Sequence, residues 1–588
     1  MNRCPLISLL LFLTTAAIAQ NSPVPLLYQP LAPTSTVPGH AAFTLRVGGT
    51  GFVSGAVVNW NGSSRMTTFI SGHEVDAAIS AADVAQAGTA SVTVTNPGPG
   101  GGTSNVVFFT IRQSLPQVAF ARRDTPVTPP SLDGPLALGL VTADFNKDGK
   151  QDIAIAWNSA TSQTAAVQVY LGNGDGTFQP PIEMDLNFLI SIPNGKMQAG
   201  DFNGDGKIDI AMATPYVCDG CGGDPTPELE ILLGTGDGHF TIAPDGGNVQ
   251  GWPIGAADFN GDGKLDLLTN STDYFGDDWP PAVNLGNGDG TFGNPIAVGN
   301  GFGVGNDYLA AIGDFNGDGK LDVAVPDGYN GAVDLYFGNG NGTFQPMKVV
   351  NTQRSGNSAM AADVNHDGKL DIVTDGVDVL LGSGDGTFTD NLVTTSGGSG
   401  APMYLQLADF NNDNKLDLMY QFDGINFLLG NGDGTFGTQQ NWNSGGTPAL
   451  SYGLADFYGD GRLDAVFFET DAFTSTPEIS VFRQTTLNIS PTFANMGAYV
   501  GQDSQPQTFT LTNIGTTPVN IGQIVPSGST SQFHGSTTCG GALSGGNSCT
   551  ITVTFHPTMQ ERAQLSLQVN YTGTSGWPQY IQISAVGF

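Results

Sequence analysis

The residues best suited to chemistry are aspartates that recur at fixed positions in a nine-residue acidic loop. The loop carries Asp at positions one, five and nine, usually with Asn at position three and Gly at position six, as in DFNGDGKLD. Side-chain oxygens at positions one, three, five and nine, a backbone carbonyl at position seven and a sharp turn at glycine suit calcium. Acidic loops one to seven begin at Asp144, Asp201, Asp258, Asp314, Asp363, Asp409 and Asp456.

The pattern predicts up to seven Ca²⁺ sites. In the sixth loop Asn414 replaces glycine, which is compatible with a left-handed turn. In the seventh, Tyr458 replaces the asparagine ligand, so we expect that site to be weak or empty. The predicted ligands are Asp144, Asn146, Asp148, Lys150 and Asp152; Asp201, Asn203, Asp205, Lys207 and Asp209; Asp258, Asn260, Asp262, Lys264 and Asp266; Asp314, Asn316, Asp318, Lys320 and Asp322; Asp363, Asn365, Asp367, Lys369 and Asp371; Asp409, Asn411, Asp413, Lys415 and Asp417; and Asp456, Asp460 and Asp464.

Two interpretations of these loops compete. Asp, Asn and Gly also favour ordinary turns without any metal, but seven copies in register favour calcium. Each lysine would give only its carbonyl and point its side chain to solvent. Without metal, three carboxylates in one loop would repel one another, which would raise their pKa values and loosen the loop.

The acidic residues are concentrated in the middle of the chain. Among 588 residues there are 53 Asp and Glu against 19 Lys and Arg, for a net charge of −34. Residues 115–485 carry 48 of the acidic and 14 of the basic residues. A charge this negative repels phosphate backbones and anionic lipid, so we expect neither nucleic-acid binding nor membrane insertion.

A second landmark follows six of the acidic loops and completes a repeat of about 50 residues. Each landmark contains Asp-Gly or Asn-Gly between apolar runs, which is a hairpin signal, so we interpret the landmark aspartates as turn residues. Each repeat is then four antiparallel strands, which is a propeller blade. The seventh repeat lacks the landmark, and we expect Gln117–Arg122 to supply its fourth strand. The landmarks are LGNGDGTF at 171–178, LGTGDGHF at 233–240, LGNGDGTF at 285–292, FGNGNGTF at 337–344, LGSGDGTF at 381–388 and LGNGDGTF at 429–436.

These repeats resemble the FG-GAP or VCBS-type repeats of integrin α-chain propellers and of many secreted bacterial proteins. The resemblance covers residues 115–485 and implies a seven-bladed β-propeller with calcium in the loop between the first two strands of each blade. The departures at Asn414 and Tyr458 affect only the last two sites.

The flanking segments alternate apolar and polar residues over short runs, which is typical of β-sandwiches. Residues 20–114 resemble an IPT/TIG immunoglobulin-like domain, through GTGFVSGAVVNWNG and GTASVTVTNPGPGGGTSN. Residues 486–588 resemble an immunoglobulin-like domain of the choice-of-anchor D or abnormal-spindle-Hydin type, through FTLTNIGTTPVNI and CTITVTFHP. We therefore expect an all-β chain: a seven-bladed β-propeller flanked by two immunoglobulin-like β-sandwich domains.

Residues 1–19 have the pattern of a secretory signal peptide, with a basic start, a short apolar run and a small-residue cleavage site. No run of residues reaches the length of a transmembrane helix. Export to an oxidising compartment makes two structural disulfides the expected state of the four remaining cysteines, Cys218 with Cys221 and Cys539 with Cys549. We expect a secreted or cell-surface monomer.

No catalytic motif stands out, because the six histidines are scattered over all three regions. The function we expect is extracellular binding or adhesion, with a protein or carbohydrate ligand; the alternative is a polysaccharide-active lyase or hydrolase on the same scaffold. Trp157, Trp252, Trp279 and Trp442 would lie near the face opposite the acidic loops. There they either bind a ligand or cover the ends of the blade cores.

Overall fold

The computed structural model is built from β-strands throughout its described part. Its one helical element there is the 3₁₀ turn Thr530–Gln532, and no helix in that part is long and apolar enough to cross a membrane. The structure describes residues 23–27, 31–99, 101–162, 164–190, 197–214, 228–243, 249, 251–272, 278–299, 310–327, 330–352, 356, 358–376, 378–392, 403–421, 425–442, 451–460, 462–470, 477–572 and 578–588.

Seven four-stranded antiparallel sheets follow one another along the middle of the chain. Sheets one to seven are: β12 (Pro135–Ala143), β13 (Asp152–Ser159), β14 (Ala165–Tyr170) and β15 (Ile182–Leu186); β16 (Gln198–Gly200), β17 (Asp209–Thr214), β18 (Glu228–Gly234) and β19 (Phe240–Ile242); β20 (Trp252–Ala257), β21 (Asp266–Thr272), β22 (Asp278–Asn284) and β23 (Ile296–Ala297); β24 (Ala311–Gly313), β25 (Asp322–Asp327), β26 (Ala332–Tyr336) and β27 (Lys348–Asn351); β28 (Ala359–Ala362), β29 (Asp371–Thr374), β30 (Asp378–Gly382) and β31 (Phe388–Leu392); β32 (Met403–Ala408), β33 (Asp417–Gln421), β34 (Ile425–Leu428) and β35 (Gln440–Trp442); and β36 (Ser451–Ala455), β37 (Asp464–Thr470) and β38 (Pro477–Gln484) with β11 (Phe120–Pro126).

Each acidic loop joins the first two strands of its sheet, and its ninth residue begins the second strand. This aspartate is fully buried in all seven copies. In sheet three, Asp266 Oδ2 accepts the N–H of Phe259 at 2.8 Å and Oδ1 accepts the N–H of Gly286 at 2.8 Å. A Cβ on Gly286 would lie 2.1 Å from the carbonyl oxygen of Leu265, so only glycine fits beside this carboxylate. The aspartate thereby ties the acidic loop to the start of the hairpin turn.

The seventh sheet takes its fourth strand from residues that precede the first acidic loop. β11 pairs antiparallel with β38, from Phe120 opposite Gln484 to Pro126 opposite Glu478. This confirms that the end of the repeat region is closed by its beginning. The strand lies at 120–126 rather than 117–122, because its register follows the whole length of β38.

Aromatic contacts join most neighbouring sheets; between sheets five and six the corresponding residue is Val364. The phenylalanine at position two of an acidic loop meets the landmark phenylalanine of a neighbouring sheet edge-on, as Phe202 meets Phe292 with ring centroids 6.1 Å apart. The same contact joins Phe457 of sheet seven to Phe178 of sheet one at 5.9 Å. The first and last sheets are therefore neighbours, and β12 also contacts β36.

The first strands of all seven sheets line one cavity of about 1730 Å³. They contribute mostly small and aliphatic residues, such as Ala256, Ala311 and Ala361. Residues of the N-terminal part of the chain, including Leu27, line the cavity too. The seven sheets thus share one central space, which the N-terminal part helps to enclose.

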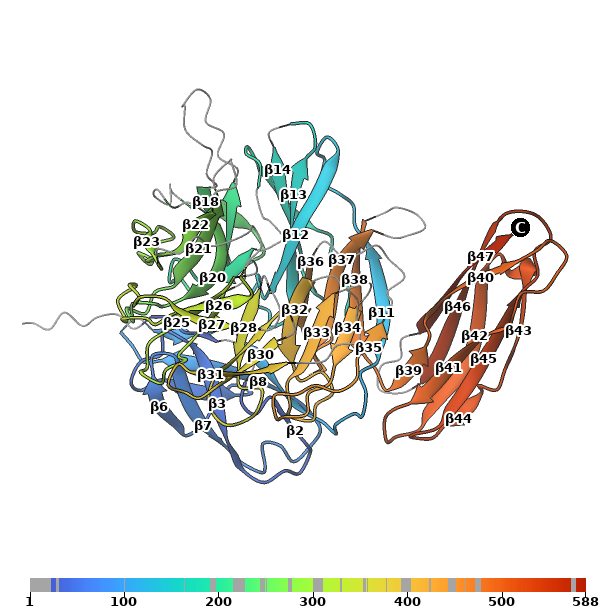
Figure 1. Cartoon of the computed structure of the whole chain (residues 1–588), viewed down its shortest axis with the longest axis horizontal. Helices are drawn as coiled ribbons and strands as arrows, with labels where there is room; N and C mark the ends of the chain where they lie inside the picture. Colours follow the sequence, from blue (N-terminus) through green and yellow to red (C-terminus); the bar gives the residue numbers. More distant parts are fainter. Residues whose placement is uncertain are drawn as a thin grey trace, which may run out of the picture.

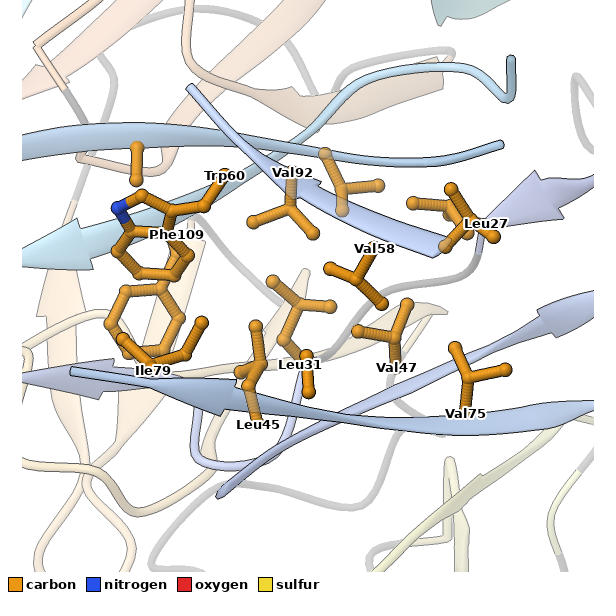
Figure 2. Packing of buried hydrophobic residues seen from close by; sticks show 14 of the residues in the cluster. Leu27, Leu31, Leu45, Val47, Val58, Trp60, Val75, Ile79, Val92 and Phe109 are labelled. Atoms are coloured by element: carbon orange, nitrogen blue, oxygen red, sulfur yellow. The ribbon is translucent and has the colours of Figure 1, made fainter. Parts of the chain in front are cut away.

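Residues 23–112, the N-terminal module, form a sandwich of two sheets. The first contains β1 (Leu26–Leu27), β3 (Phe43–Thr50), β7 (Glu74–Ile79) and β6 (Thr67–Ser71); the second contains β2 (Ser35–Thr36), β10 (Val107–Ile111), β8 (Gly88–Asn96), β4 (Val57–Trp60), β5 (Ser63–Ser64) and β9 (Gly102–Thr103). Figure 2 shows how Leu45, Val47 and Val75 of one sheet face Val58 and Val92 of the other. Alternate residues of each strand point inward, which explains the alternating sequence.

Residues 487–588, the C-terminal module, form a second two-sheet sandwich. One sheet contains β39 (Leu487–Ser490), β41 (Gln507–Asn513), β45 (Ser548–Phe555) and β43 (Phe533–Thr537); the other contains β40 (Phe493–Ala498), β47 (Gln579–Gly587), β46 (Arg562–Thr572), β42 (Val519–Gly528) and β44 (Gly541–Leu543). A disulfide joins Cys539 to Cys549, as the sequence predicts. Cys218 and Cys221 lie outside the described residues.

The two terminal modules are placed differently against the seven sheets. The N-terminal module packs on the end that carries the acidic loops, whereas the C-terminal module extends away from the seven sheets (Figure 1). The C-terminal module is tied to the junction by Thr485, whose hydroxyl lies 3.0 Å from that of Tyr571 and whose N–H donates to the carbonyl of Ala119.

Replacing the buried aspartate of one sheet should destabilise the fold even without metal. Asp266→Ala leaves two buried N–H groups without acceptors, at a cost of about 1–3 kcal/mol each. Asp289→Ala is the matched control, because the exposed Asp289 only caps the turn at Thr291. Urea unfolding in EDTA should show a much lower midpoint for Asp266→Ala than for Asp289→Ala. Equal midpoints would show that this carboxylate does not hold the loop.

Removing β11 should expose the edge of β38 and destabilise sheet seven. A chain that begins at residue 135 lacks β11, whereas one that begins at residue 113 lacks only the N-terminal module. We expect the shorter chain to aggregate or to unfold at a lower temperature, because an unpaired edge strand invites association. Size-exclusion chromatography and thermal unfolding of both chains measure this, and equally stable monomers would refute the closure.

Candidate metal centre

The acidic loops share one pattern of hydrogen bonds between side chains and backbone. In loop one, Asp144 accepts the N–H groups of Asp148 and Gly149 at 3.1 and 2.8 Å. Asn146 Oδ1 accepts the N–H of Asp148 at 2.9 Å, and Asp148 accepts that of Lys150 at 2.9 Å. Loops two to six repeat these bonds. Positions one, three and five therefore turn their oxygens toward the same short stretch of backbone.

Two residues of each of loops one to six adopt the left-handed conformation. Position six does so at Gly149, with φ of 81°, and also at Asn414, with φ of 62°. Position four does so as well, at Lys147 and at the glycines of other loops. The sequence pattern predicts a left-handed turn at position six alone. The glycines at position four of loops two to four, Gly204, Gly261 and Gly317, are the signal for the second left-handed residue.

The position-nine carboxylate connects two parts of its sheet by hydrogen bonds, and we call it the brace. Its two oxygens each accept a buried backbone N–H in every loop, in loop seven from Phe457 and Gln484. In the described part of the chain, no three His, Cys, Asp or Glu side chains form a ready metal cluster. Loops one to six thus have two carboxylates, one amide and one carbonyl around the turn, with the brace behind them.

The lysine at position seven does not point freely into solvent. Lys207 Nζ lies 2.9 Å from Asp205 Oδ2, and Lys150 and Lys320 pair in the same way at 3.3 and 3.2 Å. The aliphatic stem covers a landmark glycine such as Gly236. These ion pairs are half-exposed, and such pairs contribute little to stability. The lysine side chains thus fold back on their own loops, whereas the sequence leads us to expect them to point to solvent.

Burial governs the electrostatics of the loops. It raises the pKa of the position-nine carboxyl to about 7 at Asp152, Asp209, Asp266 and Asp322; neighbouring aspartates add to the increase, and the backbone N–H groups oppose it. Burial likewise raises the pKa of Asp201, at position one, to about 6. The sequence predicts raised pKa values for the loop carboxyls, and the pKa values of these five aspartates are raised. The main cause is desolvation rather than repulsion between carboxylates.

The donor set of loops one to five fits a hard cation. Every donor is an oxygen, and an ionised carboxylate has about four lone-pair sites, so the N–H bonds of the loop do not exhaust it. Calcium accepts such mixed sets of carboxylate, amide and carbonyl oxygens. No nitrogen or sulfur side chain that would favour a softer metal belongs to the pattern.

Loop six keeps this arrangement but is covered by the N-terminal module. Asp409 Oδ2 accepts hydrogen bonds from the hydroxyls of Ser35 at 2.5 Å and Thr34 at 2.9 Å. Asn414 Oδ1 accepts the backbone N–H of Thr34 at 3.0 Å. These contacts span about 380 residues of sequence, and no local pattern indicates them.

Loop seven is surrounded by arginines. Arg462 stands at position seven, where the other loops have lysine, and Arg483 and Arg112 reach the loop from outside it. Arg483 Nη2 lies 2.7 Å from Asp460 Oδ2, and its guanidinium covers the ring of Tyr458 at 4.2 Å. Arg112 of the N-terminal module donates to the carbonyl oxygen of Asp460. Burial would raise the pKa of Asp460, but the hydrogen bond from Arg483 and the charges of Arg462, Arg483 and Arg112 hold it below its usual value.

The landmark aspartates act as turn residues, as expected. Asp175 Oδ1 accepts the N–H and the hydroxyl of Thr177 at 3.0 and 2.5 Å, and the hydroxyl bond lowers the pKa of Asp175. Gly172 and Phe178 close the turn with a β-bridge. The same capping recurs at Asp289, Asp385 and Asp433.

Of the two described tryptophans in the seven sheets, Trp157 is a core residue. Trp157 is buried and packs edge-on against Phe468 at 5.4 Å, so it covers the contact between sheets one and seven. The interpretation of Trp157 as a ligand-binding residue is therefore wrong. Trp252 is half-buried at the start of β20, and the side chains of Trp279 and Trp442 lie outside the described residues.

Two protein-family models match parts of the chain. Residues 144–212, 201–269 and 314–374 match the model described as FG-GAP-like repeat. Residues 485–586 match the model described as HYDIN/CFA65/VesB-like, Ig-like domain. FG-GAP-like repeats and a C-terminal immunoglobulin-like domain are thus present, as the sequence resemblance implies.

Similarities to whole proteins are weaker. Phosphatidylinositol-glycan-specific phospholipase D of Mus musculus is 29% identical over 152 residues, which are 22% of this chain and 18% of that protein. The chain therefore spans less than a fifth of this relative's length.

Solved structures with similar chains include an enzyme and a binding protein. A rhamnogalacturonan lyase of Bacillus licheniformis has 14% identity and a TM-score of 0.36, covering 78% of this chain and 89% of that one. An auxiliary nutrient binding protein of Bacteroides ovatus has 11% identity and a TM-score of 0.29, covering 79% and 98%. TM-scores below 0.5 are too low to assign a function.

Proposed function

We propose that the seven sheets form a seven-bladed β-propeller, that calcium binds in its acidic loops, and that the protein is an extracellular binding module. The observation that carries the proposal is the repetition of one oxygen-lined loop, with the same hydrogen bonds, in six consecutive sheets. The packing of sheet seven against sheet one and the cavity lined by all seven first strands support the propeller.

Calcium would be held in loops one to five by the oxygens at positions one, three and five and by the carbonyl at position seven. In loop four these are Asp314, Asn316, Asp318 and Lys320. The ion would neutralise carboxylates that burial keeps from being fully hydrated. Asp322, the brace, would either complete the set with a remaining lone pair or orient the loop from behind. Calcium would thus act as a structural cofactor.

The disulfide between Cys539 and Cys549 supports an oxidising compartment, since such bonds are rare in reducing cytosol. The predicted signal peptide at residues 1–19 lies outside the described residues and forms part of the proposal. So do the finer assignments of residues 20–114 as IPT/TIG-like and of residues 486–588 as choice-of-anchor D type.

The binding role is proposed over catalysis because the aspartates of the acidic loops and of the hairpin turns already have structural partners. They brace strands, shape the acidic loops or cap hairpin turns. A protein or carbohydrate ligand would bind at the end of the sheets away from the N-terminal module. Trp252 begins β20, six residues before acidic loop three, and so lies toward that end.

Calcium should raise the thermal stability of the protein. At about 1 mM calcium, a site with a Kd of about 0.1 mM adds RT ln 11, about 1.4 kcal/mol. We expect a clear rise of the unfolding midpoint between EDTA and calcium, with about five ions bound. Magnesium is the control, because it favours a smaller octahedral shell. No shift and no bound calcium would reduce the loops to turns.

If the ligand is a carbohydrate, Trp252 is the aromatic residue to test. Trp252→Ala should weaken binding on a glycan array by roughly tenfold, about the value of one aromatic stacking contact, whereas Trp252→Phe should retain most of it. Calcium-dependent binding that is unchanged in Trp252→Ala would place the ligand elsewhere. Release of shortened polysaccharide products would contradict the binding role and favour the enzyme.

A further inference from the structure

Loops six and seven depart from the common sequence, and their polar groups form hydrogen bonds to the N-terminal module. The module also lies against loop three, where a Cβ on Gly263 would be 2.5 Å from the ring of Pro23. In loop six the departure is Asn414. Its amide oxygen accepts the N–H of Thr34, and glycine at this position would offer no acceptor. Asp409 receives the hydroxyls of Ser35 and Thr34 on Oδ2, the oxygen that also accepts the N–H of Asn414.

In loop seven the departure is the loss of an oxygen ligand and the gain of cations. Tyr458 replaces asparagine, and its ring carries the guanidinium of Arg483. Arg483 pairs with Asp460 through Oδ2, while Arg112 donates to the Asp460 carbonyl oxygen and lies 3.9 Å from Oδ1. These side chains are largely buried, with 9% of the Arg483 and 17% of the Asp460 side chain exposed.

We propose that loops six and seven form the polar docking site of the N-terminal module, and that the guanidinium groups of Arg483 and Arg112, which reach loop seven from β38 and from the module, take the place of calcium there. The proposal rests on calcium binding in loops one to five. A guanidinium is permanently charged and forms directed hydrogen bonds to oxygen. Docking through loop seven therefore does not depend on the calcium concentration.

The linker geometry agrees with this role. Arg112 directly follows β10, and its N–H donates to the carbonyl of Thr36 next to Ser35. Three residues later the N–H of Leu115 donates to the carbonyl of Asn411 in loop six. The chain therefore passes both loops on its way to β11, and the docked module closes this end of the central cavity.

The test combines a calcium count with hydrogen exchange of the full-length protein, in EDTA and in calcium. Asp318→Asn and Asp460→Asn change the same position in loops four and seven. We expect Asp318→Asn to lose one bound ion and Asp460→Asn to lose none. Loss of an ion in Asp460→Asn would overturn the proposal. If the wild-type protein binds no calcium, the proposed calcium binding is wrong. The docking of the N-terminal module is then tested by hydrogen exchange alone.

Two variants test docking with little risk to the fold. Arg112→Met removes the cation of the module, and Asn414→Gly restores the glycine of the other loops at a left-handed position. Each should speed exchange in β2 and β10 roughly three- to tenfold, with and without calcium, because fewer contacts hold the module closed. Arg46→Met is the control, since Arg46 pairs within the module with Glu74. If β2 and β10 exchange at the same rate in both variants as in Arg46→Met, the docking site is refuted.

Discussion

The fold depends on one buried carboxylate that recurs in every sheet. The aspartate that begins each second strand accepts one N–H from the acidic loop and, in sheets one to six, one from the landmark glycine. Leaving two such groups unpaired in the interior would cost several kcal/mol, as estimated from about 1–3 kcal/mol for each. The acidic loop and the hairpin turn therefore hold each other in register, and the hydrophobic strands between them follow.

The brace also explains why aspartate and glycine recur together in this sequence. Aspartate is short enough to reach two neighbouring N–H groups, and the landmark glycine leaves room for its oxygen, since a Cβ at Gly234 would lie 2.2 Å from the carbonyl oxygen of Ile208. Phenylalanine rings then join most neighbouring sheets, including sheet seven to sheet one through Phe457 and Phe178. Local polar bonds set each unit, and aromatic packing joins the units.

The N-terminal module changes how the acidic end of the molecule is understood. The repeats alone predict up to seven cation sites at this end, with the seventh weak or empty. In the structure, Ser35 and Arg112 bring a neutral donor and a permanent charge to two of the loops. Contact between the N-terminal module and the seven sheets thus uses the same kind of loop that we propose for calcium.

The sequence alone determined the loops, the hairpin turns, the Cys539–Cys549 bond and the strand that completes sheet seven, since each is set by residue types at short spacings or by the repeat. Three features depended on tertiary structure: the bracing role of Asp266, the burial of Trp157 and the docking of Thr34 on Asn414. Their partners are 7, 20 or 380 residues away in the chain, or belong to another sheet. Spacing alone does not indicate such contacts, because strand pairing within a sheet, packing between neighbouring sheets and docking of the N-terminal module bring those residues together.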